Sequence, residues 1–204
     1  MLATVLGALW AGAPPLLAQS AAPAAPASFE TTRIITVWAS VLFDETGACR
    51  SLRFSDKSDP PDELLQRLRA PLERMRIPPK LDGGQPATFE TGLRIEVNIL
   101  SDGSSSRFKL DSLTLQPLPV STVAPDYPAV MVDGGTGRFE VDATCVVSES
   151  GRCTAVTLKP KGVVPETFLR AMRATYAQWT FEPQKLNGRP VPGEATMGFA
   201  LVVN

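Results

Sequence analysis

The strongest constraint on the fold is an internal repeat at an offset of 104 residues. Residues 33–100 align with residues 137–204 without a gap, and 14 of the 68 aligned pairs are identical. Ordinary residue usage gives about four identities by chance over such a span. The shared positions include the turn glycines Gly47 and Gly151. The sequence therefore predicts two copies of one small fold.

Length and charge limit what each copy is able to do. The chain has 204 residues, of which 44% are hydrophobic, so a unit of about 70 residues lies near the lower size limit for an independent core. The net charge is −1, and the sequence has no run of Lys or Arg. It therefore has no electrostatic footprint for nucleic acid or for an anionic membrane surface. We expect two small domains and no nucleic-acid partner.

The N-terminus has the pattern of an export signal. Residues 1–18 carry no charged side chain and combine an apolar stretch with small residues before Gln19. This pattern predicts a signal peptide cut after Ala18, followed by an Ala/Pro-rich tether over residues 19–32. The alternative is an uncleaved N-terminal anchor, but the apolar run is shorter than the roughly 20 residues that a spanning helix needs.

Each copy begins with the signature of a bulged β-hairpin. Alternating apolar residues predict a first strand, and the sequences ending in Gly47 and Gly151 predict a tight antiparallel turn. In the second strand a step of three residues separates Cys49 from Leu52 and Cys153 from Val156. An odd step in a period-two pattern indicates a β-bulge in both copies.

A helix and a last strand complete each copy. Pro61 and Pro165 open the two predicted helices, and Pro71 is expected to kink or break the first one near residue 70. A Gly83-Gly84 or Asn187-Gly188 turn then leads to an alternating strand at the end of each copy. The predicted fold class is α+β, with two tandem small domains that each have a three-stranded antiparallel sheet (strand-strand-helix-strand) and one helix packed on it.

The second copy carries an ordered set of motifs. They are Tyr127-Pro128, Ser148-Glu149-Ser150-Gly151, Trp179-x-Phe181-x-Pro183, Asn187-Gly188-x-Pro190 and a terminal apolar strand. This set resembles the C-terminal domain of TonB-family energy transducers over residues 125–204. The first copy, residues 33–100, resembles the same domain more faintly, with Met75-x-Ile77-x-Pro79 in place of the aromatic pair.

The resemblance implies a non-catalytic periplasmic binding module. In the family, the last strand is an exposed sheet edge that captures a short peptide, the TonB box of an outer-membrane transporter, as an additional strand. Here the binding residues would be Met197, Gly198, Phe199, Ala200, Leu201, Val202 and Val203. The partner would be that transporter peptide or another TonB-like domain, and a homodimer is a further candidate.

A structural role is the alternative of equal weight. In this interpretation the last strand pairs with the other copy or with a second molecule, and the protein is an envelope adaptor or dimerisation protein without energy transduction. The basic start, membrane anchor and long spacer of complete transducers are not visible in the sequence.

Residues 101–124 join the two copies. The stretch begins and ends with linker-like residues, but four apolar residues in its middle, Phe108, Leu110, Leu113 and Leu115, suggest a short extra strand. If that strand forms, the two domains are not freely jointed.

The three cysteines suggest one disulfide. Cys145 and Cys153 flank the hairpin turn of the second copy, and the bulge brings both to its apolar face, so a cross-strand bond is geometrically plausible. TonB-like domains with cysteines at this spacing look similar. Cys49 faces Val41 instead of a cysteine and is expected to be a buried free thiol. The alternative for all three is simple core filling.

The sequence argues against catalysis. It has no His, which removes the usual base of Ser and Cys hydrolases and the commonest zinc ligand. Asp44, Glu45, Asp62 and Glu63 lie at predicted turns or helix starts, where capping explains them. We therefore expect no catalytic residue, no metal and no cofactor.

Overall fold

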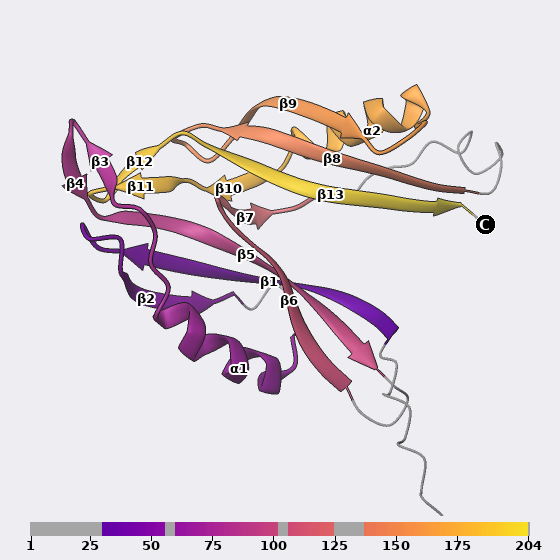
Figure 1. The fold of residues 1–204 in the computed structure, drawn as a ribbon. Coiled ribbons are helices and arrows are strands. Elements are labelled where there is room, and N and C mark those ends of the chain that lie inside the picture. The colour runs from indigo at the N-terminus through magenta and orange to yellow at the C-terminus, as the bar shows by residue number, and fades with distance from the viewer. Residues whose placement is uncertain (1–29, 56–59, 102–105, 125–136, 204) are drawn as a thin grey trace, which may run out of the picture.

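The structure is a computed structural model that describes residues 30–55, 60–101, 106–124 and 137–203. In these ranges the chain is an α+β fold with two helices and mostly antiparallel strands. The elements (Figure 1) are β1 (Glu30–Phe43), β2 (Cys49–Phe54), α1 (Asp62–Glu73), β3 (Lys80–Asp82), β4 (Gln85–Ala87), β5 (Phe89–Ser101), β6 (Ser106–Gln116), β7 (Leu118–Ser121), β8 (Gly137–Val147), β9 (Cys153–Pro160), α2 (Glu166–Tyr176), β10 (Thr180–Glu182), β11 (Gln184–Leu186), β12 (Arg189–Val191) and β13 (Gly193–Val203).

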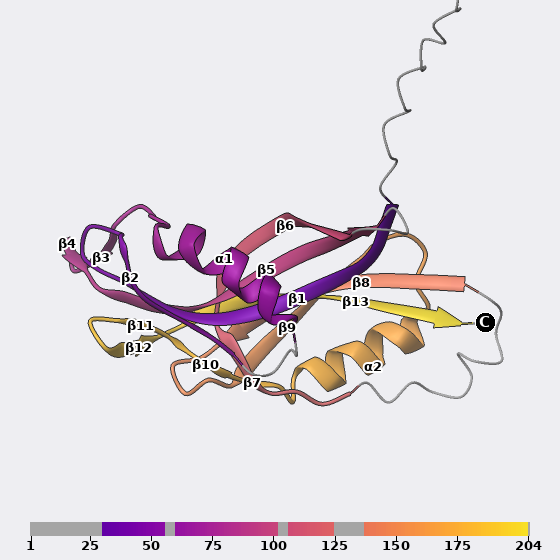
Figure 2. The ribbon, with the colours of Figure 1, turned by 90° about the horizontal axis from the view of Figure 1, so that it is seen from below.

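Two sheets lie between the two helices, α1 on one outer side and α2 on the other (Figures 1 and 2). The first sheet has the order β12-β11-β5-β1-β2, and β6 also pairs with β5. The second sheet has the order β13-β8-β9. Two small two-stranded sheets, β10-β7 and β3-β4, complete the described part of the fold.

The two repeats pair their strands in the same register. Val37 lies opposite Ile95 in the β1–β5 pair, and Val141 lies opposite Phe199 in the β8–β13 pair. Each residue of the second pair is 104 positions beyond its counterpart in the first. The repeat seen in the sequence is therefore also a repeat of strand pairing.

Both predicted bulges are confirmed. The register of β1 on β2 shifts between Leu42 and Phe43, and that of β8 on β9 shifts between Val146 and Val147. Each shift leaves one residue of the second strand without an opposite partner. Such an extra residue explains the step of three in the apolar pattern.

The turn before each bulge requires glycine. Gly47 and Gly151 have φ angles of +78° and +77°. A Cβ atom on either would lie 2.0 Å from a backbone carbonyl oxygen, that of Ile77 or of Phe181. The same close approach allows the Ile77 and Phe181 N–H groups to donate to the two glycine carbonyls, at 2.9 and 2.8 Å. These glycines therefore join each hairpin to the segment that follows its helix.

A polar side chain closes each of these turns. The carboxylate of Asp44 accepts a hydrogen bond from the Ala48 N–H at 2.9 Å and one from the Thr46 hydroxyl at 2.7 Å. The Thr46 hydroxyl, followed by the Ala48 N–H, lowers the pKa of Asp44 to about 2. In the second repeat the Ser148 hydroxyl accepts the Arg152 N–H at 3.2 Å. Asp44 therefore has a structural role, as its turn position predicts.

Each helix buries its apolar stripe on the sheet of its own repeat. Leu64 and Leu72 of α1 belong to the core of the first sheet. Phe168 and Met172 of α2 pack on the second sheet, and Tyr176 lies among the aromatic rings at the end of the helix. Full burial of one such side chain contributes about 1.5–3 kcal/mol to folding.

The break expected near residue 70 does not occur, because α1 continues through Pro71 to Glu73. A kink at Pro71, the other expected outcome, stays a prediction. Proline at this position removes one hydrogen bond in the last turn of the helix. The side chain of the next residue, Leu72, is buried in the core. Packing of Leu72 therefore holds the last turn in place.

The segment that joins the repeats is an integral part of the sheets. The predicted extra strand is confirmed as β6, which pairs with β5 along its whole length. β7 pairs with β10 of the second repeat, and β11 pairs with β5 through Lys185 opposite Glu90 and Leu186 opposite Phe89. The sheet of the first repeat therefore has six strands where the sequence predicts three.

The N-terminal boundary also differs from the prediction. The tether was expected to extend to residue 32, but β1 begins at Glu30 and pairs with the end of β5 from there. The long β5 supplies backbone partners beyond the repeat, so β1 extends with it. The expected signal peptide, residues 1–18, and the Tyr127-Pro128 motif lie outside the described residues.

The hairpin formed by β11 and β12 in the second repeat also contacts the first repeat through its turn. The Asn187 side chain accepts a hydrogen bond from the Thr88 N–H at 3.1 Å and donates one to Asp82 at 3.1 Å. Arg189 forms an ion pair with the same Asp82 carboxylate. Strand pairing of β11 with β5 and these tip contacts hold the two repeats together.

Alanine substitutions at Gly151 and Gly188 should differ in their effect on stability. Gly188 has a φ of +76°, close to that of Gly151, but a Cβ there meets nothing within 4 Å. We expect Gly188→Ala to lower the free energy of unfolding by about 1 kcal/mol, and Gly151→Ala by about 3 kcal/mol or more. Urea denaturation of both variants tests this, and equal losses would contradict the role of the Phe181 carbonyl.

Candidate functional site

The predicted binding residues form a sheet edge. In the described part of the chain β13 pairs with β8 and has no strand on its other side. Met197, Phe199 and Leu201 are partly buried and pack toward the cores beneath α2. Gly198 and Ala200 occupy positions on the opposite face, because successive positions of a strand alternate between its two faces. For Val202 and Val203 the structure describes the backbone within β13.

Two side chains of the first sheet cover the start of this edge. The Thr196 N–H donates to Oε1 of Gln116 at 3.1 Å, and the Thr196 carbonyl accepts from Nη1 of Arg94 at 3.3 Å. Both Thr196 groups therefore point away from β8. Their direction fits the side-chain hydrogen bond between Thr196 and Thr144 at 2.9 Å, since such close contact is typical of residue pairs whose backbone groups point outward.

Gln116 is the residue that ties β6 to β13. Its side chain is almost completely buried, and its amide nitrogen lies 4.0 Å from the sulfur of Met197. Its main-chain carbonyl is 3.4 Å from the hydroxyl of Thr91 in β5. A buried amide with these partners fixes the point at which the two sheets meet.

Beyond Thr196 the edge borders an open groove of about 280 Å³. Residues 197–200 form one wall, and the polar face of the first sheet forms the other, with Ile34, Thr36, Arg94 and Glu96. Ile34 is 64% exposed, so this wall also offers an apolar surface to solvent. The groove therefore begins where the Thr196 contacts end.

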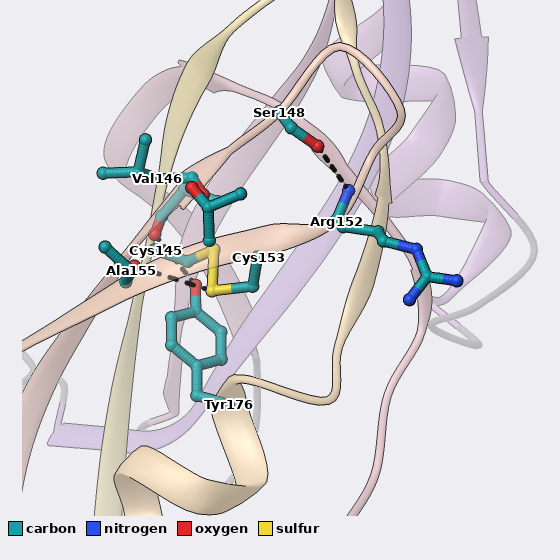
Figure 3. Close-up of a disulfide and its surroundings, with 9 residues drawn as sticks. Cys145, Val146, Ser148, Arg152, Cys153, Ala155 and Tyr176 are labelled. Atoms are coloured by element: carbon teal, nitrogen blue, oxygen red, sulfur yellow. Dashed lines mark hydrogen bonds between the residues drawn. A yellow bond between two sulfur atoms is a disulfide. The ribbon is translucent and has the colours of Figure 1, made fainter.

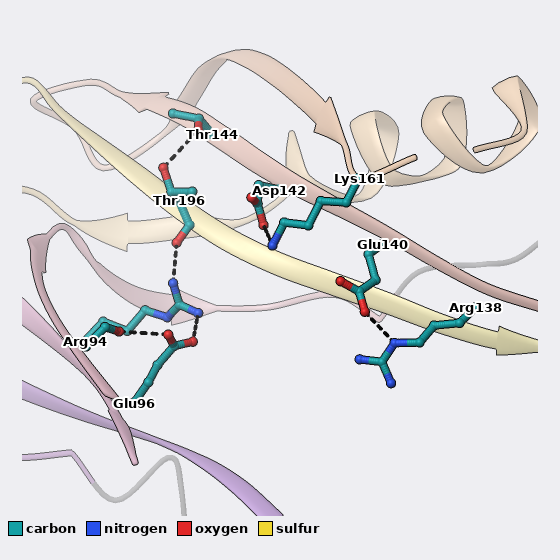
Figure 4. A network of polar contacts seen from close by, with 9 residues as sticks. Arg94, Glu96, Arg138, Glu140, Asp142, Thr144, Lys161 and Thr196 are labelled. Atoms are coloured by element: carbon teal, nitrogen blue, oxygen red, sulfur yellow. Dashed lines mark hydrogen bonds and ion pairs between the residues drawn. The ribbon is translucent and has the colours of Figure 1, made fainter. Parts of the chain in front are cut away.

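Three ion pairs line the groove (Figure 4). They are Arg94 with Glu96, Arg138 with Glu140, and Lys161 with Asp142, the last at 2.9 Å between Nζ and Oδ1. The Arg138 and Lys161 pairs are largely exposed, so each contributes at most about 1 kcal/mol to stability. With one cation for each carboxylate, this lining has no net charge.

Arg94 differs from the other two cations because its side chain is only 15% exposed. Its Nη atoms are used by Glu96 and by Thr196, whereas Nε is buried and has no hydrogen-bond partner in the described part of the chain. Arg94 is therefore held in place at the inner end of the groove.

The predicted disulfide is confirmed. Cys145 and Cys153 are bonded across the β8–β9 hairpin, with a Cα–Cα distance of 5.6 Å (Figure 3). Tyr176 lies next to this bond in Figure 3, and its hydroxyl donates to the Ala195 carbonyl of β13 at 2.9 Å. Burial raises the pKa of the Tyr176 hydroxyl well above its usual range. The disulfide and Tyr176 thus brace the strands that carry the candidate edge.

Cys49 is a free thiol, as predicted, but it is only partly buried. Partial burial and the nearby Glu73 carboxylate raise its pKa. A raised pKa keeps the thiol protonated and weakly nucleophilic at neutral pH.

Sequence reasoning located the edge strand and missed the residues that cover its beginning. Gln116 lay in a predicted linker, and Arg94 lay at an outward position of a strand expected to belong to a separate domain. Arg94 is 102 residues from Thr196 in the sequence, and Gln116 is 80 residues from it. The sequence signal that could have located Gln116 is the run of apolar residues that predicted β6, because a strand there has Gln116 at its end.

Comparisons with known protein families, with curated proteins and with solved structures return no match to this chain. In the described ranges, neither helix has the length and apolar character needed to cross a bilayer. The site is therefore interpreted from its own geometry.

Removing the Gln116 amide is expected to destabilise the contact between the sheets. Gln116→Leu keeps the side-chain volume but leaves the Thr196 N–H without its acceptor, at a cost of about 1–3 kcal/mol. Gln178→Leu is the matched control, because Gln178 is exposed, and its loss should cost less than about 0.5 kcal/mol. Thermal unfolding compares them, and a neutral Gln116→Leu would remove the role assigned to this residue.

Loss of the disulfide is expected to lower the free energy of unfolding by about 2.5 kcal/mol, the loop-closure entropy of so short a loop. The double variant Cys145→Ala, Cys153→Ala measures this by urea denaturation, and Cys49→Ser serves as the control with an intact bond. Alkylation of the unreduced, denatured protein should modify one cysteine, and modification of all three would contradict the bond.

Proposed function

We propose that the protein is a non-catalytic periplasmic binding module, similar to the TonB C-terminal domain, that captures an extended peptide on the outer edge of β13. The partner would be a segment of an outer-membrane transporter in TonB-dependent transport. The observation that carries this proposal is the open edge of β13 beside a groove lined by residues 197–200.

Backbone geometry supports peptide addition at this place. The Thr196 N–H and carbonyl point away from β8 and are taken by side chains. Backbone direction alternates along a strand, so the groups of Gly198, Ala200 and Val202 point the same way. These groups are a template for main-chain hydrogen bonds to an added strand.

The disulfide supports export. Disulfides persist in oxidising compartments such as the bacterial periplasm and are rare in the cytosol. The Cys145–Cys153 bond therefore agrees with the signal peptide predicted for residues 1–18. An uncleaved N-terminal anchor, with the same domains in the periplasm, remains the alternative.

We assign the two repeats different parts in this function. In this proposal they are tandem TonB-like domains, residues 33–100 and 125–204, joined through residues 101–124. β6 pairs with most of the outer edge of β5, so in the described residues the edge of β5 that corresponds to the open edge of β13 is occupied. The second repeat would bind the partner, and the first would be its structural support.

A structural role is the second candidate function, and one observation favours it. β11 of the second repeat already pairs with β5 of the first, so this chain uses strand addition to hold its own parts together. By the same means β13 would pair with β13 of a second copy or with another envelope protein, without energy transduction.

Titration of a TonB-box peptide into the purified protein tests the binding proposal. We expect the backbone amide signals of residues 198–203 to shift. Gly198→Pro removes an outward N–H that the β8 ladder does not use, so binding should weaken about tenfold, the effect of one hydrogen bond.

Gly198→Ala is the matched control. A Cβ at this position meets only the Asp142 carboxylate, at an ordinary contact distance of 3.5 Å, and the N–H is kept. This variant should bind like the parent protein. Absence of any shift at residues 198–203 in the parent protein would reject peptide capture at β13.

A further inference from the structure

The first repeat already contains an added strand at the position that is open in the second. The outer edge of β5 carries β6, with Leu93 opposite Leu115 and Ile95 opposite Leu113. At an offset of 104 the same β5 positions correspond to Met197 and Phe199 of β13. The β13 positions have no added strand in the described part of the chain. The fold thus provides an internal precedent for what covers this edge.

The pairing of β6 with β5 indicates the direction in which an equivalent strand would run along β13. β6 runs antiparallel to β5, with Gln116 opposite Gly92 and Phe108 opposite Ile99. Since β1–β5 and β8–β13 share one register, an equivalent strand on β13 would have its C-terminal end near Thr196. Its N-terminal end would lie near Val203.

The pairing of β6 with β5 also shows which sizes of side chain lie opposite each other. In the first sheet, Thr114 and Ser112 of β6 lie opposite two long charged residues, Arg94 and Glu96. The Ser112 hydroxyl donates to Glu96 at 2.8 Å. On this face, small residues of β6 therefore lie opposite large residues of β5.

In the second sheet the edge strand β13 has small residues at the positions where β5 has large ones. Gly198 and Ala200 occupy the positions equivalent to Arg94 and Glu96. Their cross-strand neighbours on β8 are Asp142 and Glu140, which are both partly exposed and lie in ion pairs. A long polar side chain on an added strand has space to extend over Gly198 or Ala200 toward these pairs.

We infer that the peptide captured by β13 binds antiparallel, in the register that β6 has on β5, and that it is amphipathic. Apolar side chains lie opposite Met197, Phe199 and Leu201, and long polar side chains lie opposite Gly198 and Ala200. This inference rests on the proposed function, because it describes the orientation and chemistry of the peptide at the same edge.

Charge and packing favour this pattern over a uniformly apolar peptide. The α2 side of β13 continues the core through Phe199 and Leu201, so apolar residues on that face extend an existing apolar surface. The opposite face is the groove with its three ion pairs and no net charge. Polar side chains there keep the carboxylates and cations hydrogen-bonded.

The probe for this inference is a synthetic peptide with the sequence of β6, residues 106–116. One version carries a nitroxide spin label at its N-terminus and the other at its C-terminus. In the inferred orientation the N-terminal label broadens the amide signals of Val202 and Val203. The C-terminal label broadens that of Met197.

A second comparison tests the pattern of side chains. The peptide with Ser112→Gln and Thr114→Gln should bind at least about threefold more tightly than the β6 peptide, the effect of part of one added hydrogen bond. Replacement of Leu113 and Leu115 by Gln should abolish binding. Gly198→Pro serves as the weakened protein variant, and Gln178→Leu, at an exposed residue outside the β13 edge, serves as the unchanged one.

The outcomes separate the inference from the proposed function. The reversed broadening pattern would show parallel addition and overturn the inference while leaving peptide capture intact. Unchanged signals at residues 198–203 with every peptide would overturn both. Signals in this range that shift with protein concentration alone would identify a second copy as the occupant and also overturn the inference.

Discussion

The arrangement of the two sheets depends on how the backbone of Thr196 is satisfied. A buried N–H or carbonyl without a partner costs about 1–3 kcal/mol, so an edge strand that approaches another sheet must find acceptors and donors there. Gln116 and Arg94 supply one of each. Because both come from the first sheet, they fix the place where β13 touches it. Together with the pairing of β11 on β5 and the contacts of Asn187 and Arg189 with Asp82, this contact sets the position of β13 beside the groove. In the described residues, no strand pairs with the outer edge of β13 beyond this point.

The repeats share their internal pairing and differ in what covers their edges. In the second repeat β10 pairs with β7 through Glu182 opposite Leu118. The equivalent residue of the first repeat is Pro78, which has no N–H to donate. In the first repeat, β5 carries both β6 and β11 on its outer edge. In the described residues the outer edge of β13 carries no strand, and Thr196 is bound there by side chains of the first sheet. Divergence has therefore acted on the edges and left the registers unchanged.

Features that depend on neighbouring residues were predictable from the sequence. The bulges followed from the step between Cys49 and Leu52, and the disulfide followed from two cysteines on one face of a hairpin. The six-stranded sheet was not predictable in this way, because its extra pairing, Lys185 with Glu90, joins residues far apart in the chain. The break expected at Pro71 does not occur for a related reason. Its local effect on the helix was outweighed by tertiary packing of Leu72.

The composition of β13 supports a binding role for its edge. Exposed edges invite aggregation, and proteins usually blunt them with charged residues, proline or bulges. The other edge of the same sheet follows this rule, since β9 ends in Lys159 and Pro160. Residues 197–203 contain neither a charged residue nor a proline, and β13 pairs with β8 without a bulge. In the described part of the chain, no strand pairs with the outer edge of β13. The strand therefore lacks the usual protection of an exposed edge, a feature that the proposed peptide capture would explain.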